Sequence, residues 1–369
     1  MGNVKNKALL CVAFATVALV GCDTKTPNAP GSGAAKTASV AGRPVFSLAW
    51  SEYPSWSVFG VAEGRGLLNG KPGEYGSLEE RYNVDIELKQ LGYDECITLY
   101  SAGQVDAVCI TNTDALNPAA TRRSVAVLPT STSVGADACV VVGIKDVADL
   151  RGKKVYGLEK SVSQYCFVRC LEVAGESESQ HVFTNMAPEA AAAAMQTGSA
   201  DVTAIMVWNP FVMSTLKSRK ESKVLFDSGA IPEEIIDMVV VAEAVLDRPQ
   251  SADFVAAMMD AFYTVSGLLD EPQHRDATLV ALGAKFSNLN AAEMARVLEQ
   301  TRIYKTPQAA VDLFKSDKLK QAMQRIGDFC KKHDMLKEIP SIVYGEKSKT
   351  PAQLLFDSSY LQRALPKKP

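Results

Sequence analysis

Short apolar segments alternate with helix-like segments from residue 45 to residue 245, and this alternation restricts the possible folds more than any other feature. Runs rich in strand-forming residues, such as Val45–Ala49 and Ala107–Ile110, predict strands. The segments between such runs predict helices, because glycines end several of them and Pro188 stands at the favoured first position of another. Strands that alternate with helices are typical of an α/β fold.

The same alternation begins again after Val142, which predicts two α/β lobes. A faint internal repeat agrees with this division, since Gly103–Asp106 and Gly198–Asp201 each connect an alanine-bearing helix to an apolar strand. The strongly apolar segment Met238–Val245 predicts a strand that returns to the first lobe. The expected boundaries are residues 44–137 plus 238–369 for the first lobe and residues 138–237 for the second.

From Pro249 onward the pattern is mainly helical. Helices are predicted over residues 253–269, 291–299, 309–314 and 319–330. The polar end of the chain, from Tyr344, predicts one further helix near Gln353, packed on the surface of the first lobe.

The N-terminal segment predicts export and anchoring. Two lysines precede the 13-residue apolar-rich run Ala8–Val20, which is too short to span a bilayer but is typical of a signal peptide. Leu19–Cys22 resembles the lipobox of bacterial lipoproteins, which implies cleavage before Cys22 and a lipid on its sulfur; an ordinary signal peptide is the alternative. Residues 1–21 are thus expected to be removed, and residues 22–43, rich in Pro, Gly, Ala and Ser, to form a flexible tether. We expect an exported protein of the cell envelope (periplasm), attached to a membrane through this lipid only.

The composition is that of an ordinary soluble protein, with 47% hydrophobic residues and a net charge of −3. It contains no basic stripe, so nothing indicates nucleic-acid binding. An exported protein can form disulfides, but several cysteines lie in apolar strands or helix faces, where a free thiol behaves as a small hydrophobic group. We therefore expect mostly free thiols among the six cysteines that follow Cys22, which are Cys96, Cys109, Cys139, Cys166, Cys170 and Cys330.

Catalytic patterns are sparse. The three histidines, His181, His274 and His333, are far apart and have no metal-ligand spacing. The HExxH, GxSxG and CxxC motifs are absent from the sequence. Cys166 and Cys170 fall on one helix face, which indicates a buried face, with a disulfide or a thiol function as alternatives. We expect no metal, no cofactor and no enzymatic activity.

Aromatic and polar residues instead gather at the carboxyl ends of predicted strands and the amino ends of predicted helices. The loop from Trp50 to Trp56 alone places three aromatic rings and one carboxylate after the first strand. Two facing lobes would bring such ends together in one cleft; the alternative is that the tryptophans only cap a core. The predicted ligand-binding residues are Trp50, Glu52, Tyr53, Trp56, Asn112, Asp114, Thr130, Thr132, Ser161, Ser163, Trp208 and Asn209.

The chemistry of this set is mixed. Free N–H groups at a helix start, such as the one around Ser163, bind anions. Tryptophan faces together with Glu52 or Asp114 suit cations. A zwitterionic ligand would satisfy both halves of the set.

Several motifs resemble those of type II periplasmic solute-binding proteins, nearest the nitrate/sulfonate/taurine (NitT/TauT-like) branch that feeds ABC importers. They span roughly residues 44–270, and their order along the chain carries the resemblance. The motifs are the lipobox, the aromatic loop before Ala62–Gly66, the Ala102–Ala107 element, the Pro188–Ala190 helix with Gly198–Asp201, and Trp208–Phe211.

The resemblance implies two lobes joined by a hinge around an interlobe cleft. It also implies a monomer that captures a small polar solute and delivers it to an ABC permease and its ATPase. The sequence departs from the family in two ways: the connection at residues 69–80 is long, and the acidic Glu52 and Asp114 are unusual for a purely anionic ligand. The resemblance implies a ligand of the nitrate, sulfonate or taurine kind, and the acidic residues favour an amine-bearing or zwitterionic member of that group.

Two other functions remain open at this point. A ligand-sensing lipoprotein could use the same fold to bind a receptor instead of a permease. An enzyme resembling thiamine-pyrimidine synthases would need that family's cysteine-rich motif near Tyr165–Cys170, where only two cysteines and no histidine occur. Neighbouring permease and ATPase genes would favour the importer over the sensor, and ligand turnover would favour the enzyme.

Overall fold

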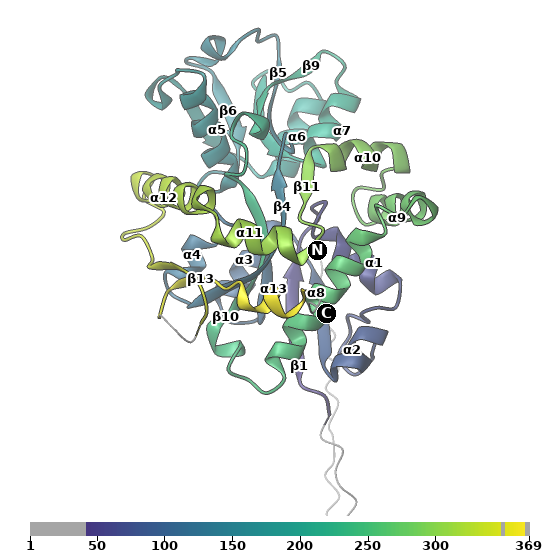
Figure 1. The fold of residues 1–369 in the computed structure, drawn as a ribbon. Coiled ribbons are helices and arrows are strands. Elements are labelled where there is room, and N and C mark those ends of the chain that lie inside the picture. The colour runs from purple at the N-terminus through teal and green to yellow at the C-terminus, as the bar shows by residue number, and fades with distance from the viewer. Residues whose placement is uncertain (1–41, 348–350, 366–369) are drawn as a thin grey trace, which may run out of the picture. The chain divides into compact units, whose positions relative to one another are not determined.

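Two β-sheets form the framework of the chain (Figure 1). The structure, a computed structural model, describes residues 42–347 and 351–365. The predicted signal peptide, Cys22 and most of the tether lie outside the described residues. From Arg43 onward the chain forms one unit.

The larger sheet has eight strands. Seven follow the order β12-β13-β4-β10-β3-β1-β2, and β11 pairs with β4. The strands are β1 (Val45–Trp50), β2 (Asp85–Gln90), β3 (Ala107–Thr111), β4 (Ser124–Ser133), β10 (Ile236–Ala242), β11 (Thr301–Ile303), β12 (Ile342–Tyr344) and β13 (Leu354–Phe356).

The smaller sheet has five strands in the order β7-β6-β8-β5-β9. It appears at the top of Figure 1, together with the helices that cover it. The strands are β5 (Asp137–Val142), β6 (Lys154–Gly157), β7 (Val182–Asn185), β8 (Ala204–Trp208) and β9 (Ser222–Asp227).

The two sheets repeat one arrangement. In the larger sheet the parallel strands β2, β1 and β3 are followed by the antiparallel β10 and then by β4. In the smaller sheet the parallel strands β7, β6 and β8 are followed by the antiparallel β5 and then by β9. The repeat seen in the sequence precedes β3 and β8, which hold equivalent places, and its glycines, Gly103 and Gly198, both have a φ of 75° that favours glycine.

The chain passes between the sheets twice. Residues 134–136 connect β4 to β5, and residues 228–235 connect β9 to β10. We call these two segments the crossings. The Ser133 and Ser228 hydroxyls lie 2.6 Å apart, and the Gly135 N–H donates to the Ser228 hydroxyl at 2.8 Å. The two crossings are therefore hydrogen-bonded to each other.

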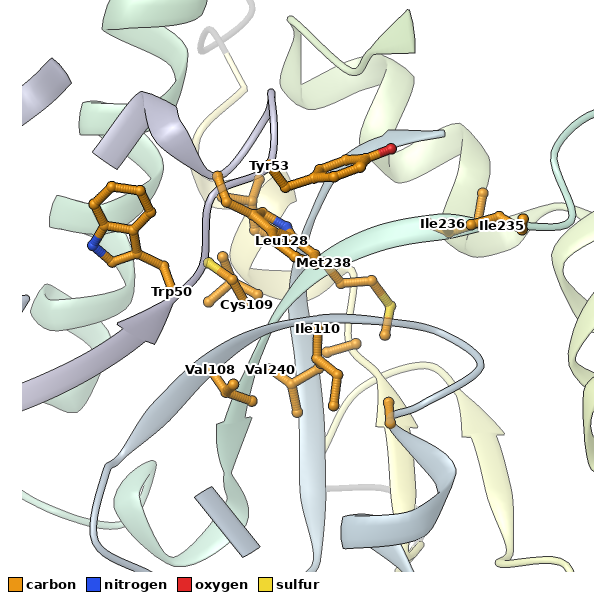
Figure 2. Packing of buried hydrophobic residues seen from close by; sticks show 14 of the residues in the cluster. Trp50, Tyr53, Val108, Cys109, Ile110, Leu128, Ile235, Ile236, Met238 and Val240 are labelled. Atoms are coloured by element: carbon orange, nitrogen blue, oxygen red, sulfur yellow. The ribbon is translucent and has the colours of Figure 1, made fainter. Parts of the chain in front are cut away.

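Helices pack around both sheets. Figure 2 shows Val108, Ile110, Leu128, Met238 and Val240 packed in the core of the larger sheet. No single helix among the described residues is long and apolar enough to cross a membrane. Helices α8 and α9 are long and apolar enough only when taken together, and the pair is bent by 114°. The helices are α1 (Ser57–Gly64), α2 (Ser77–Tyr82), α3 (Tyr93–Ser101), α4 (Leu116–Ala119), α5 (Val162–Val173), α6 (Pro188–Gln196), α7 (Phe211–Ser218), α8 (Ser251–Gly267), α9 (Pro272–Ala284), α10 (Ala291–Glu299), α11 (Pro307–Lys315), α12 (Asp317–Lys332) and α13 (Ser359–Arg363).

The structure differs from the expected elements in several places. The apolar run Ser124–Leu128 predicts a strand, and β4 continues beyond it to Ser133, because β10 and β11 pair with its second half. The segment after Gln353 first forms β13, which pairs with the edge of β4, and only then the short α13. Helix α9 was not expected from the sequence. The six described cysteines are buried and free, as expected.

The long connection at residues 69–80 is organised by one buried carboxylate. Glu79 lies on α2 and is fully buried. Its oxygens accept backbone N–H groups of Asn69 at 2.5 Å, Gly76 at 2.7 Å and Ile86 at 2.7 Å. Three separate stretches of backbone therefore depend on the same side chain.

Replacing Glu79 with alanine should lower the free energy of unfolding by about 3 kcal/mol, because three buried donors lose their acceptor. Chemical denaturation measures this change. Glu80 is exposed on the same helix, so Glu80→Ala is the matched control and should change stability by about 0.5 kcal/mol or less. Equal losses in the two variants would show that the helix, and not the buried carboxylate, stabilises this connection.

Candidate ligand-binding site

A small buried cavity lies where residues of both sheets meet, and we call it the aromatic cavity. Its volume is about 10 Å³, measured as the space open to the centre of a water molecule, which suffices for about one water. Each lining residue stands at the end of a strand, at the start of a helix or in a connection between strands. The lining residues are Tyr53, Trp56, Tyr93, Thr111, Asp137, Val162, Trp208, Ile235 and Asp237.

Four aromatic rings form one continuous side of the cavity. The ring centroids of Tyr53 and Trp56 lie 4.9 Å apart, and those of Trp56 and Tyr93 lie 5.6 Å apart. The rings of Tyr93 and Trp208 pack edge to face, with their centroids 5.7 Å apart. Because Trp208 ends β8 and the other three rings come from the larger sheet's side, the wall joins the two sheets.

Two buried carboxyl groups also line the cavity. Asp137 is 3% exposed and Asp237 is 1% exposed. The Ser133 hydroxyl donates to Asp137 at 2.6 Å, and the Ser131 hydroxyl donates to Asp237 at 2.5 Å. Within the part of the chain that the structure describes, no Lys, Arg or His forms an ion pair with either aspartate. Negative charge at this cavity is therefore left without a positive partner.

Burial governs the ionisation of these groups. It raises the pKa of Asp137 to about 6, with the charge of Asp227 adding to the rise and the Ser133 hydroxyl opposing it. It also raises the pKa of Asp237 well above the usual range, where Ser131 opposes the shift and the charge of Asp137 adds to it. A positive charge in the cavity would favour the ionised forms of both aspartates.

The raised pKa of Asp137 predicts that stability falls as pH rises. Between its ordinary value of 3.8 and about 6 the folded protein binds more protons at this site than the unfolded chain does. Stability is therefore lost as pH rises through that window, by up to about 3 kcal/mol. Asp137→Asn should remove this dependence. The unfolding free energy of the variant should therefore rise relative to that of the wild type between pH 4 and pH 7. Asp201→Asn, at an exposed acid, is the control; a wild-type profile parallel to that of Asp137→Asn would contradict the assignment.

A third buried carboxyl, Asp114, accepts a hydrogen bond from one aromatic residue of the wall. The Tyr93 hydroxyl donates to it at 2.8 Å and the Thr111 hydroxyl at 3.1 Å. Burial raises the pKa of Asp114 to about 7, and these two hydroxyls and the N–H of Val162 oppose the rise. Val162 is the first residue of α5, which Ser161 caps by accepting the Ser163 N–H. The start of α5 therefore already faces a carboxyl of the protein.

A larger opening, of about 670 Å³ in the same measure, adjoins the aromatic cavity and shares Tyr93 and Trp208 with it. We call it the acidic cleft, because four carboxylates line it and its lining contains no Lys, Arg or His. Burial, and then the charge of Glu189, raises the pKa of Asp94. The four carboxylates belong to Glu52, Asp94, Glu95 and Glu189.

Two polar atoms of the aromatic wall have no hydrogen-bond partner. They are the Tyr53 hydroxyl and the indole Nε1 of Trp56, whose residues are 4% and 3% exposed. Buried polar groups are normally satisfied, so unpaired ones at a cavity point to a ligand or to water. Among the described residues, no group of three or more His, Cys, Asp or Glu side chains is arranged to hold a metal ion.

The structure brings half of the predicted ligand-binding residues to an opening. Tyr53, Trp56 and Trp208 line the aromatic cavity. Glu52 lines the acidic cleft, where its carboxylate accepts the Ser287 N–H. Asp114 and Ser161 line a separate opening of about 280 Å³ that also includes Tyr93.

The other predicted residues lie away from these openings. Trp50 packs in the core, so closely against Gly60 that an added Cβ there would lie 2.7 Å from the indole, and Figure 2 shows its ring directed away from Tyr53. Ser163 is buried, and its hydroxyl has no partner. The remaining four bind protein atoms: Asn112 binds Glu234 O and Ile236 N, Thr130 binds Ser55, Thr132 binds Ile235 O, and Asn209 binds Gln300.

Several residues of the cavity wall were not predicted from the sequence. Tyr93 starts α3, and the two aspartates lie beside the crossings. Asp237 carries a usable signal, because an acidic residue directly before the apolar run from Met238 must be buried with that strand. Asp137 carries a weaker one, since it is the last polar residue before the apolar part of β5.

Two sheets of matching strand order, with a cavity where they meet, define the fold of a periplasmic binding protein. The periplasmic aliphatic sulphonate binding protein SsuA from Escherichia coli has a TM-score of 0.64 at 20% identity, over 80% of this chain and 89% of that chain. The alkanesulfonate-binding protein SsuA from Xanthomonas axonopodis pv. citri has a TM-score of 0.63 at 19% identity, over 80% and 95%. A Candida albicans protein described as having the generic periplasmic binding protein fold has a TM-score of 0.57 at 14% identity, over 80% and 92%. The expected fold class is confirmed.

At the level of sequence, the similarity covers a shorter part of the chain. Residues 83–265 match the family model described as NMT1/THI5 like. No curated protein sequence matches this chain significantly. The matched segment runs from just before β2 into α8, so it contains every residue of the aromatic cavity except Tyr53 and Trp56.

Proposed function

We propose that this protein is the substrate-binding component of an ABC importer and holds a small polar solute without converting it. The observation that carries the proposal is the aromatic cavity, whose wall combines residues of both sheets beside the two crossings. Periplasmic binding proteins close by a hinge around their ligand. The solute would then be presented to a permease and its ATPase by a monomeric protein.

The proposal includes two lobes. The first comprises residues 44–137 and 238–369, and the second comprises residues 138–237. Support comes from the division of the strands, since β5 to β9 form one sheet and all the others form the second. Within residues 42–347 and 351–365, only the two crossings connect the sheets through the backbone, so they are the natural position of a hinge. Their serine hydrogen bonds would keep the two segments moving together.

The relatives support an importer. The Escherichia coli and Xanthomonas proteins of the same fold are named as sulfonate-binding proteins, one of them periplasmic. A ligand-binding component of an ABC-type import system from Staphylococcus aureus also has this fold, with a TM-score of 0.58. The described residues also show binding features, namely a buried aromatic wall and unpaired polar atoms.

The experiment is native mass spectrometry of protein purified under non-denaturing conditions. We expect a fraction of the protein to carry a constant added mass, which unfolding and refolding removes. Returning the released small-molecule fraction should raise the unfolding temperature, since a ligand at 100 times its dissociation constant adds about 2.7 kcal/mol of stability. No added mass together with no stabilisation would contradict a binding protein, and a changed mass of the released solute would indicate an enzyme.

We also propose that the mature chain is a lipoprotein of the periplasm, anchored through Cys22. Support comes from Leu19–Cys22 after the apolar-rich run Ala8–Val20. Cys22→Ser should move the protein out of the washed membrane fraction or leave it unprocessed. The control is Cys11→Ser, within the expected signal peptide, which should leave partition unchanged. Retention of the Cys22→Ser protein on salt-washed membranes after normal processing would contradict lipid attachment.

A further inference from the structure

Resting on the proposed function, we propose that the solute is an organic cation with an ammonium or amidinium nitrogen, and not a sulfonate or another anion. Four independent features of the openings lead to this assignment. They are the unpaired carboxyls, the aromatic wall, the start of α5 and the acidic cleft.

The carboxyls of Asp137 and Asp237 determine the sign of the charge. Both line the cavity, both are at least 97% buried, and their described partners are hydroxyl groups. A buried charge is stable only when it is paired and hydrogen-bonded. A cation with N–H donors would supply the missing partner, whereas an anion placed here would add repulsion to the cost of burial.

The aromatic wall suits the same class of ligand. The faces of Trp and Tyr rings attract a cation within about 6 Å of the ring centre. Tyr53, Trp56, Tyr93 and Trp208 all line the cavity. The cavity as described holds about one water, so it must open for a solute to enter. In the opened site the rings would contact the apolar part of an organic cation, while the aspartates would take its N–H groups.

The N-terminus of helix α5, which would otherwise favour an anion, lies beside a carboxyl of the protein. Asp114 lines the same opening as Ser161, the residue that caps α5. Asp114 also accepts the Tyr93 hydroxyl at 2.8 Å. A sulfonate at the start of α5 would therefore lie beside a protein carboxyl.

The acidic cleft provides the route by which a cation reaches the aromatic cavity. Its four carboxylates adjoin the cavity at Tyr93 and Trp208, and no basic side chain lines it. A cleft lined by one sign of charge attracts the opposite charge and raises the association rate. The unpaired Trp56 Nε1 can only donate, so the cation should also carry a neutral acceptor such as a hydroxyl or an ether oxygen.

The test is calorimetric titration of the full-length protein with matched probes of opposite charge. The cations are butylammonium and benzamidinium, and the anions are butanesulfonate and benzenesulfonate, which share the same apolar groups; nitrate and taurine complete the set. We expect the cations to bind and the four other compounds to bind at least tenfold more weakly. Asp137→Asn and Asp237→Asn should each weaken cation binding at least tenfold. Asp85→Asn, at a buried aspartate that lines neither the aromatic cavity nor the acidic cleft, should not.

Each other result has a defined meaning. Binding of an anion or of taurine without binding of the cations would overturn the cationic ligand and leave the proposed binding function intact. Cation binding that both asparagine variants retain would also overturn it, because the aspartates would then not recognise the charge. No binding of any probe would overturn the cationic ligand, and the native mass spectrometry described above would decide separately whether the protein binds a solute. The wild-type comparison decides between these results even if a variant fails to fold.

Discussion

Replacing Trp50 with alanine will lower the free energy of unfolding by about 3–5 kcal/mol, the usual cost of removing a buried tryptophan. Replacing Trp208 will instead weaken solute binding at least tenfold. Trp50 is 1% exposed and packs against Gly60 in the core. Trp208 lines both the aromatic cavity and the acidic cleft, and its described ring contacts are with Tyr93 and Phe211.

The comparison uses chemical denaturation and retention of the natural solute in native mass spectrometry. Because two ring contacts are lost, Trp208→Ala should reduce the stability of the solute-free protein by only about 1–3 kcal/mol. Trp208→Phe, which keeps a ring, should recover part of the binding. A stability loss in Trp208→Ala as large as that of Trp50→Ala, with solute retention unchanged, would place Trp208 in the core and remove the smaller sheet's aromatic side from the site.

Changing Glu234 to glutamine should lower the free energy of unfolding by about 3 kcal/mol, because it breaks a largely buried ion pair. Glu234 lies on the second crossing, and its oxygens accept two N–H groups of Arg169, both at 2.9 Å, and the Tyr165 hydroxyl at 2.7 Å. Arg325 of α12 also lies 3.5 Å away. Burial alone would raise the pKa of Glu234, but these partners lower it below its usual value.

The neighbouring residue provides the control. Glu233 pairs with Arg302 and Lys318, whose side chains are 55% and 76% exposed. Glu233→Gln should therefore cost about 1 kcal/mol or less. Urea denaturation of both variants at neutral pH measures the difference. Equal losses would mean that the link between α5, the crossing and α12 does not depend on the buried glutamate.

The sequence predicted the α/β fold well because its strongest signals are local. The apolar runs that became β3 and β8 are buried along their length, and β1 is buried from Phe46 onward, so period and composition identify them. The repeated glycine turns before β3 and β8 mark equivalent strands in the two sheets. In contrast, β13 has only three residues and depends on pairing with the edge of β4, a contact that no local pattern reports.

The site was harder to predict because its parts are distant in sequence. Trp50 and Trp56 belong to the same loop region, yet only Trp56 reaches the cavity, since the side chain of Trp50 belongs to β1 and points into the core. Asp137 and Asp237 are 100 residues apart and meet because the chain crosses between the sheets at both places. Sequence pattern could indicate a cleft at strand ends, but not which ends face one another.

The hydrogen-bonded crossings also bear on how such a protein can diversify. The segment between Ser133 and Ser228 begins and ends at one point, since these hydroxyls lie 2.6 Å apart. A segment with adjacent ends can be exchanged as a block with little change in the chain that receives it. Such an exchange would carry Asp137 and Trp208 into a new partner and leave Asp237 behind. Half of the recognition surface could thus be inherited independently of the other half, and new solute preferences could arise by recombination as well as by point substitution.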